Sequence, residues 1–327
     1  YNSIIIERPS IKWEQVIGLT QPKQILKEKL ILPLKFPNLF TGKHISKGFV
    51  LLYGPPGCGK SYLAKALANE VSATYFSVSS ADFVSKYYCE GEKLIKQLFQ
   101  IASEKKPSII LLDEIDSICV NRDYQYSSAR RLRTELLVQL HGLKSDAGVY
   151  IIACTNVPWQ VKSDKAMNRR IEQKIYIGLP SKDDRKLMFE SYMNQHNNLE
   201  HNLSQEHYLT LSEMTQGFSG SDINCCFRDV LFEPVRQLQK AKYFKRIYEN
   251  EDDKDSDDYK LVACDINDDG AFKMTIMDCG DGNAERIKPN PIQMKDFIRV
   301  LSNYRASVSD EDIARHLECM EDWNDTQ

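Results

Sequence analysis

The octapeptide GPPGCGKS at 54–61 has the residue types and spacing of a phosphate-binding loop. It lies between an apolar strand-like run and a helix-like run, which is the context such a loop requires. Glycines let backbone N–H groups converge on phosphates, and the helix N-terminus adds partial positive charge. We expect Lys60 to neutralise the terminal phosphates and the Ser61 hydroxyl to ligate Mg²⁺. The predicted nucleotide-binding residues are Gly54, Pro55, Pro56, Gly57, Cys58, Gly59, Lys60 and Ser61.

Adjacent carboxylates end the apolar run SIILLDEID at 108–116. Asp113 is predicted to hold Mg²⁺ through a water, because Mg²⁺ keeps much of its hydration. Glu114 is predicted to polarise the attacking water, since hydrolysis needs a positioned base. An isolated Asp-Glu pair is more often a solvated strand end, and the upstream phosphate-binding loop favours the catalytic interpretation. Asp116 is predicted to be structural.

An asparagine and two arginines complete the candidate catalytic set. Asn156 ends the apolar run VYIIACTN, where its amide could orient a water or sense the γ-phosphate. A turn-forming asparagine is the alternative. Arg169 and Arg170 lie together in NRRIE just before another strand-like run. Arginine pairs are usually surface charges, but in an oligomeric ATPase they can reach a neighbour's γ-phosphate, and the residues alone leave both possibilities open.

The segment VSKYYCEGEK at 84–93 contains adjacent tyrosines, Tyr87 and Tyr88. Neighbouring side chains cannot share one face of a strand or a helix. At least one of the two rings is therefore expected to be exposed and available for contact with a ligand or partner.

These residues require an alternating α/β framework to position them. Five strand-like runs alternate with amphipathic helical stretches through the first two-thirds of the chain, which predicts a mostly parallel sheet covered on both faces. Ligands of such sheets lie at the carboxyl ends of the strands. The strand-like runs are 48–54, 74–79, 108–116, 149–156 and 174–180.

The remaining chain is predicted to be a small helical domain that carries a short β insertion. An acidic run at 249–258 indicates a mobile loop. YKLVACDI and FKMTIMD, which follow it, are interpreted as a short strand pair. Two helices near 293–304 and 309–322 are expected to close the chain.

Length and composition fit a globular protein of about two domains. The chain has 327 residues and a formal charge of -3, which gives no bias toward nucleic acid or anionic membranes. Its nine cysteines form no CxxC pair or regular spacing, so reduced thiols in a cytosolic compartment are expected rather than zinc or disulfides. No apolar run has the length of a transmembrane helix. The chain begins at Tyr1 without a signal peptide, and could be a fragment.

The motifs in this order resemble the AAA family of ring-forming ATPases. The resemblance to its meiotic clade rests on ERPSIKWEQVIGL, LPLKFPNLFTGK, GPPGCGKSYLAKALA, SKYYCEGEKLIKQLF, PSIILLDEIDSI and TNVPW. RDVLFEPVRQLQKAKYFK and IQMKDFIRVLSNYRASVSDEDIARHLE are similar to the branch that disassembles ESCRT-III filaments. The resemblance implies a large α/β domain at 1–182, a small helical domain at 183–308 with its β insertion at about 249–291, and a C-terminal helix at 309–327 that packs back on the large domain.

The resemblance also implies how the protein works. It implies a homohexamer that binds ATP and Mg²⁺, with Gly18 of VIGL near the adenine. Lys86, Tyr87 and Tyr88 would line a central pore that threads ESCRT-III subunits. The protein would be cytoplasmic, recruited to endosomal membranes through its partners. No nucleic-acid partner is implied.

The sequence departs from the family pattern at several positions. Tyr87 stands where tryptophan is usual, and Cys89 replaces a glycine. The segment before the arginines is two residues longer than the pattern, with Asn168 and Ile171 in place of arginine and phenylalanine. In the second pore loop, Arg130 and Arg131 match the family's basic pair.

Three other functions are weighed against this one. A microtubule-severing ATPase of the same clade is the nearest, but the β insertion and the acidic chain argue against it, because acidic tubulin tails favour a strongly basic pore. A non-hydrolysing nucleotide-dependent scaffold is disfavoured by the complete set of catalytic residues. Nucleic-acid translocation is the weakest, since no basic, aromatic-rich module is visible.

Overall fold

The structure is a computed structural model, and its residues form two compact units. The large unit comprises Tyr1–Ser181 and Val308–Gln327, and the small unit comprises Lys182–Ser307. The structure describes residues 5–7, 9–40, 48–79, 91–119, 127–142, 148–196, 200–248, 259–278 and 286–324.

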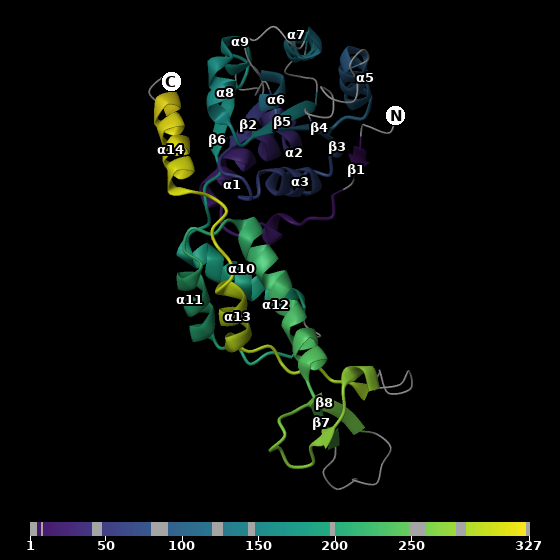
Figure 1. Ribbon diagram of the computed structural model, residues 1–327. Helices are drawn as coiled ribbons and strands as arrows, with labels where there is room; N and C mark the ends of the chain where they lie inside the picture. The colour runs from purple at the N-terminus through teal and green to yellow at the C-terminus, as the bar shows by residue number, and fades with distance from the viewer. Residues whose placement is uncertain are drawn as a thin grey trace. The chain divides into compact units, whose positions relative to one another are not determined.

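A six-stranded sheet in the order β1-β3-β4-β5-β2-β6 forms the centre of the large unit (Figure 1). All neighbouring strands are parallel except β1, which pairs antiparallel with β3. This confirms the predicted α/β fold with a parallel sheet. The short edge strand β1 was not predicted, because three residues give too little alternation to detect. The strands are β1 Ile5–Glu7, β2 Phe49–Tyr53, β3 Thr74–Ser79, β4 Ser108–Asp113, β5 Val149–Thr155 and β6 Gln173–Tyr176.

Alternate residues of the central strands face two separate apolar clusters. On one face Leu51 and Ile110 pack with residues of α5 and α7. On the other face Leu52 and Ile109 pack with residues of α3. Burial on both faces explains why the sequences of these strands are continuous apolar runs and do not alternate between apolar and polar residues. The helices are α3 Lys60–Glu70, α5 Gly91–Glu104 and α7 Ser127–Gly142.

Shorter helices complete the large unit. α1, Thr20–Leu26, continues through a π-helical turn at Lys27–Ile31 into α2, Leu32–Lys35. α6, Asp116–Cys119, follows the end of β4, and α8, Pro158–Ser163, follows the end of β5. α9, Lys165–Asn168, comes before β6.

The last helix, α14 (Asp310–Asn324), belongs to the large unit although it follows the small unit in sequence. Its Cys319 and Trp323 are buried in the same apolar cluster as the α5 and α7 side chains. The Trp323 ring meets the Tyr53 ring edge-on, with centroids 4.7 Å apart. Figure 1 shows α14, in yellow, as an additional helix alongside α8.

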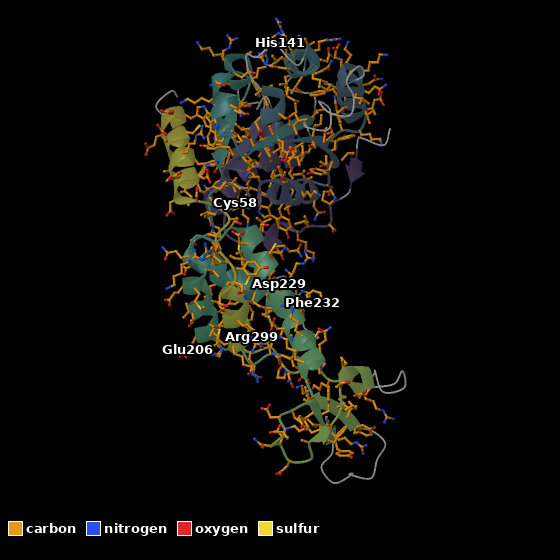
Figure 2. All side chains as sticks on the ribbon, viewed as in Figure 1. Cys58, His141, Glu206, Asp229, Phe232 and Arg299 are labelled. Carbon is orange, nitrogen blue, oxygen red and sulfur yellow. The ribbon has the colours of Figure 1, made fainter. Side chains whose placement is uncertain are left out.

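In the described part of the small unit, four α-helices pack together and a small sheet follows α12. Phe189 of α10 and Phe297 of α13 meet edge-on in the helical core, with centroids 5.9 Å apart. Arg299 of α13 donates to Glu233 of α12 over 3.2 Å, and Tyr304 donates to Asp229 (Asp229 and Arg299 are labelled in Figure 2). The helices are α10 Lys182–Gln195, α11 Gln205–Met214, α12 Gly220–Lys240 and α13 Met294–Leu301.

The sheet of the small unit differs from the predicted strand pair. β8, Tyr259–Ala263, and β9, Phe272–Lys273, do not pair with each other; both pair antiparallel with β7, Tyr243–Tyr248. The prediction missed β7 because YFKRIY follows the amphipathic α12 with no glycine or proline at the junction. The small sheet therefore includes residues from Tyr243 onward.

Within the described ranges, every helix is too short or too polar to cross a membrane.

Candidate nucleotide site

The phosphate-binding loop joins β2 to α3 and depends on its glycines. Gly54 has φ 149°, and a Cβ there would lie 2.0 Å from the carbonyl oxygen of Ile177, so only glycine fits. Gly59 precedes α3 with φ 91°, a conformation that side chains rarely adopt. The strand–loop–helix context that the sequence predicted is therefore present, with the N-terminus of α3 at the loop.

Lys60 is the first residue of α3, and its side chain is buried against the loop that precedes it. Its ammonium group donates to the carbonyl oxygens of Gly54 and Pro55 over 2.8 and 2.7 Å. Burial lowers the pKa of this amine. The ammonium group is thus fixed at the loop, at the position where phosphate charge would need a cation.

Ser61 and Asp113 meet across the sheet end. The Ser61 hydroxyl donates to Asp113 Oδ2 over 2.7 Å, although 52 residues separate the two. A hydroxyl beside one carboxylate suits Mg²⁺, which prefers oxygen ligands and retains waters and substrate phosphates. Elsewhere in the ranges that the structure describes, no three His, Cys, Asp or Glu side chains gather as metal ligands. These two side chains fit the predicted Mg²⁺ position.

Glu114 follows the end of β4 in an unusual backbone conformation. Its φ is 53°, in the left-handed region that non-glycine residues seldom occupy. The turn is held because Glu114 N–H donates to Asp113 Oδ1 over 3.0 Å and Ile115 N–H donates to the Cys154 carbonyl over 3.1 Å. The Glu114 side chain is exposed at the rim of the sheet, next to Asp113. Strained residues held by their surroundings are common at functional sites.

Asn156 lies just beyond β5, at the same sheet edge. The preceding Thr155 donates its hydroxyl to Asp116 and accepts the Val157 N–H over 2.9 Å, so Asp116 supports the strand end, as expected of a structural residue. The Asn156 carbonyl contacts Nε2 of His316 at 3.0 Å, while Nδ1 of that ring contacts the carbonyl of Asp312 at 2.7 Å. His316 of α14 is 2% exposed. The last helix thus holds the backbone beside Asn156.

Arg169 and Arg170 follow the single-turn helix α9. Arg169 donates to the Lys165 carbonyl over 3.2 Å, and Arg170 donates to the Ala166 carbonyl over 2.8 Å. Arg169 is exposed and Arg170 is half-buried. Neither contact brings these side chains to the phosphate-binding loop of their own chain, so the structure does not by itself assign them to a site.

The structure says less about the other predicted site residues, Gly18 and the pore residues at 86–88. Gly18 has φ 66° and lies between Val16 and Leu19, which pack in the same apolar cluster as Cys58 of the phosphate-binding loop (Cys58 is labelled in Figure 2). Lys86, Tyr87 and Tyr88 lie outside the described residues, so their pore role stays a prediction.

Two contributors to the region around the site were not predicted. His316 is distant in sequence, and nothing in its local pattern points to Asn156. Asp164 accepts the amides of Ala166 and Met167 and caps α9. Its position one residue before a short helix is a recognisable cap signal.

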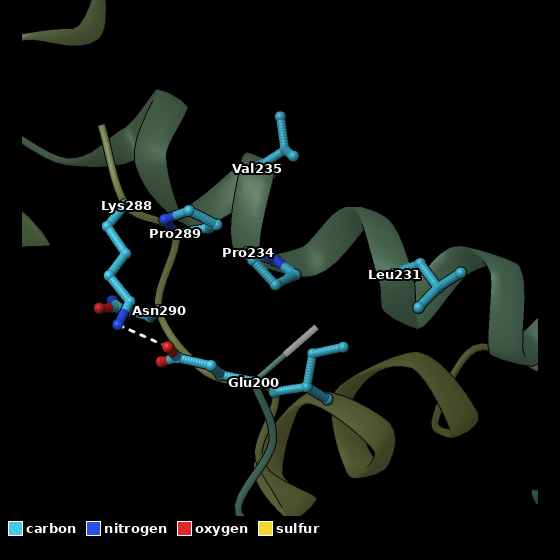
Figure 3. Close-up of a pocket in the computed structure, with 8 residues that line it drawn as sticks. Glu200, Leu231, Pro234, Val235, Lys288, Pro289 and Asn290 are labelled. Atoms are coloured by element: carbon cyan, nitrogen blue, oxygen red, sulfur yellow. Dashed lines mark ion pairs between the residues drawn. The ribbon is translucent and has the colours of Figure 1, made fainter. Parts of the chain in front are cut away.

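The small unit contains a pocket that none of the predicted site residues line (Figure 3). An ion pair between Lys288 and Glu200, 2.6 Å long, lies at its edge. Pro234, inside α12, forms part of its wall. Its lining residues are Glu200, Leu231, Pro234, Val235, Lys288, Pro289, Asn290 and Ile292.

Two protein families match this chain. Residues 50–179 match the ATPase family associated with various cellular activities (AAA). Residues 261–323 match the Vps4 C terminal oligomerisation domain. Vacuolar protein sorting-associated protein 4B of Pongo abelii is 44% identical over 327 residues, which cover 98% of this chain and 72% of that protein. The chain belongs to the vacuolar protein sorting-associated protein 4 family of AAA ATPases.

A second relative agrees with this family, and a solved structure agrees with its AAA fold. Vacuolar protein sorting-associated protein 4 of Dictyostelium discoideum is 42% identical, with 98% of this chain and 71% of that protein covered. The FIGL-1 AAA domain, solved in complex with ADP, superposes with a TM-score of 0.73 and 27% identity, covering 96% of this chain and 91% of that one. The family assignment makes this chain a nucleotide-binding ATPase.

Proposed function

We propose that the protein is a homohexameric ATPase that disassembles ESCRT-III filaments by drawing their subunits through its central pore. The observation that carries the proposal is similarity to vacuolar protein sorting-associated protein 4 along 98% of the chain. The match to an oligomerisation domain at 261–323 supports the assembled state. In this proposal the protein is cytoplasmic and joins endosomal membranes through its partners.

In each nucleotide site, residues at one edge of the sheet would bind the phosphates, hold Mg²⁺ and activate the attacking water. Residues 54–61 bind the phosphates, with Gly18 near the adenine. Ser61 and Asp113 would hold Mg²⁺, which when bound neutralises charge on the phosphates. Glu114 polarises the attacking water and Asn156 orients it. The Ser61–Asp113 hydrogen bond and the held turn at Glu114 support this division.

Arg169 and Arg170 would act on the nucleotide of the neighbouring subunit. An arginine supplied in trans stabilises the charge of the phosphoryl-transfer transition state. On this basis Arg170→Ala keeps ATP affinity and loses turnover. Mixing it with Glu114→Gln restores part of the activity, because some mixed interfaces pair an intact Glu114 with an intact arginine.

The pore would grip its substrate through Lys86, Tyr87 and Tyr88. Aromatic rings can wedge against an extended polypeptide with little demand for its sequence. Lys86 adds a positive charge beside the rings. Tyr87 is the principal aromatic contact in this proposal, and Tyr88 adjoins it.

The test uses filaments assembled from purified ESCRT-III subunits and followed by sedimentation. The parent with ATP should move subunits from the pellet to the supernatant. Glu114→Gln should bind ATP, turn over at least about a hundredfold more slowly and release none. Tyr87→Ala should keep basal ATP hydrolysis and lose disassembly. Parental disassembly by the Tyr87 variant would contradict the pore mechanism.

Microtubules in the same assay test the nearest alternative. Stabilised microtubules incubated with the parent and ATP should remain intact. Severing of microtubules together with inactivity on ESCRT-III filaments would overturn the proposed substrate while leaving the ATPase class unchanged.

A further inference from the structure

A bidentate ion pair connects helices α7 and α9. Arg133 of α7 donates from Nε to Asp164 Oδ2 and from Nη2 to Asp164 Oδ1, each over 2.5 Å. The Asp164 side chain is 3% exposed and the Arg133 side chain 33%. Paired guanidinium–carboxylate contacts fix relative orientation as well as distance. The pair therefore sets how α9 sits against α7.

Asp164 also controls where α9 begins. Its Oδ1 accepts the N–H groups of Ala166 and Met167, each over 3.1 Å. α9 has only four residues, and so short a helix depends on its cap and its packing. Arg169 and Arg170 follow directly. A small rotation of α9 about its cap would move both guanidinium groups.

Helix α7 is attached on its other side to α5. Arg131 and Glu92 lie 3.9 Å apart, as an exposed pair, and Lys96 lies 3.8 Å from Glu135. Leu132 packs tightly on Gly91, where a Cβ would come within 2.5 Å of it. α7 is thus connected to α5 on one side and to α9 on the other; the three helices lie together at one end of the large unit (Figure 1).

The helix α5 begins at Gly91, directly after the segment that carries Lys86, Tyr87 and Tyr88 in sequence. Arg130 and Arg131, the basic pair of the second pore loop, lie on α7 itself. Helix α7 therefore contacts α5, which follows the first predicted pore loop in sequence, and itself carries the basic pair of the second. Through Arg133 it also contacts Asp164, which caps the helix before Arg169 and Arg170.

We propose that Arg133 and Asp164 are positioning residues that orient Arg169 and Arg170 toward the neighbouring subunit's nucleotide and couple them to α7. The inference rests on the proposed trans role of those arginines. It assigns the ion pair to turnover rather than to nucleotide binding, because neither residue contacts the phosphate-binding loop. The pair acts as a unit, so loss of either partner releases α9.

Asp164→Asn tests the ion pair while it keeps the hydrogen bonds that cap α9. The asparagine oxygen can still accept the Ala166 and Met167 amides and one N–H of Arg133, while its NH₂ group meets the Arg133 Nε–H and cannot pair with it, so the charge and the bidentate contact are lost. We expect the ATP dissociation constant to stay near the parental value, and the variant to be folded at the assay temperature although loss of the buried ion pair lowers its melting temperature. The kcat for ATP should fall by about a hundredfold, the order of effect of misplacing a reacting group. Mixing with Glu114→Gln should restore part of the activity.

Arg133 variants provide the matched comparison. Arg133→Met keeps the apolar stem and should lose turnover like Asp164→Asn. Arg133→Lys keeps the charge without the bidentate contact and should recover only part of the turnover. The double variant Arg133→Met/Asp164→Asn should lose no more than either single variant, because the residues act through one contact. Lys96→Gln, which breaks the α5–α7 ion pair with Glu135, should keep parental turnover.

The outcomes distinguish this inference from the function on which it rests. If Arg170→Ala is rescued in mixtures while Asp164→Asn and Arg133→Met keep parental kcat, the positioning role is overturned and the trans arginines stand. Loss of turnover that follows unfolding at the assay temperature, without rescue in mixtures, also overturns it and assigns the pair to stability. If Arg170→Ala itself is never rescued, the trans role falls and this inference falls with it.

Discussion

At the residue scale, Lys60 combines burial with a fixed position. Its ammonium contacts two carbonyl oxygens of the loop, and burial lowers its pKa. A desolvated cation at a phosphate-binding loop is electrostatically stronger than one in water. Its loss would leave the phosphate charge without its principal counter-charge.

We predict that Lys60→Ala abolishes measurable ATP binding. Titration calorimetry with ATP should give no saturable heat, and a melting temperature near that of the parent should show that the protein is folded. Lys35→Ala is the matched control, because Lys35 makes an exposed 2.7 Å ion pair with Glu70 in the same unit. Unchanged ATP affinity in Lys60→Ala would refute the phosphate-binding assignment.

Asp164 gives a second prediction at the residue scale, in the pH dependence of stability. Burial raises the pKa of its carboxyl, but the hydrogen bonds from Arg133 and the Met167 amide outweigh burial, and the pKa lies below its ordinary 3.8. A carboxyl with a lower pKa in the folded state stabilises the protein above its unfolded pKa. That contribution is lost as the pH falls through the folded value.

The difference in free energy of unfolding between the parent and Asp164→Asn should therefore stay constant from pH 7 down to the unfolded pKa of 3.8 and shrink as the pH falls below it. Urea denaturation at several pH values measures it. A difference that does not shrink below pH 3.8 would show that the charge of Asp164 contributes nothing to stability.

At the element scale, the local sequence pattern predicts the central strands and the phosphate-binding loop well. Apolar runs such as 108–116 and the spacing of glycine and lysine in 54–61 are dictated by burial and by phosphate geometry. β1 and β7 escaped prediction because neither a three-residue edge strand nor a strand continuous with an amphipathic helix has a distinct periodicity. Pairing partners depend on contacts distant in sequence, which explains the wrong pairing predicted for β8 and β9.

The contacts of the candidate site also differ in this way: the local sequence predicts some of them, and others depend on residues distant in sequence. The proximity of Ser61 and Asp113 was expected, since carboxyl ends of parallel strands share one edge. The contact between His316 and the Asn156 carbonyl could not be expected, because 160 residues separate the two and nothing local encodes it. The packing of the C-terminal helix on the large domain was expected from the family resemblance and not from the residue pattern of the helix.

Helix α14 should stabilise the large unit mainly through Trp323. This side chain is 3% exposed, meets Tyr53 and has the Lys174 ammonium 5.2 Å from its ring centroid. Trp323→Ala should lower the free energy of unfolding by about 3–5 kcal/mol, as is usual when a buried aromatic is truncated. Leu317→Ala, on the same helix at a side chain 38% exposed, should change it little. Equal effects on urea denaturation would contradict this role for α14.

At the scale of the whole molecule, one chain contains only part of the proposed catalytic machinery. Residues 54–61, Asp113 and Glu114 come from one subunit, and the arginines at 169 and 170 would come from the next. Residues 261–323, which match an oligomerisation domain, include parts of both units. Hydrolysis in this arrangement requires assembly, and ATP held without turnover should favour the assembled state by mass action.

We therefore predict nucleotide-dependent assembly of Glu114→Gln. Light scattering after size exclusion should give a mass in ATP about six times that of the 37.7 kDa chain, and a smaller mass without nucleotide. Lys60→Ala should keep the smaller mass in ATP, because it cannot bind the ligand that couples the subunits. Glu114→Gln/Arg170→Ala should assemble less well than Glu114→Gln, since the arginine contact to the neighbour's phosphate is lost. A mass for Glu114→Gln that does not depend on ATP would contradict nucleotide-driven assembly. An unchanged mass in the double variant would instead place Arg170 outside the subunit interface.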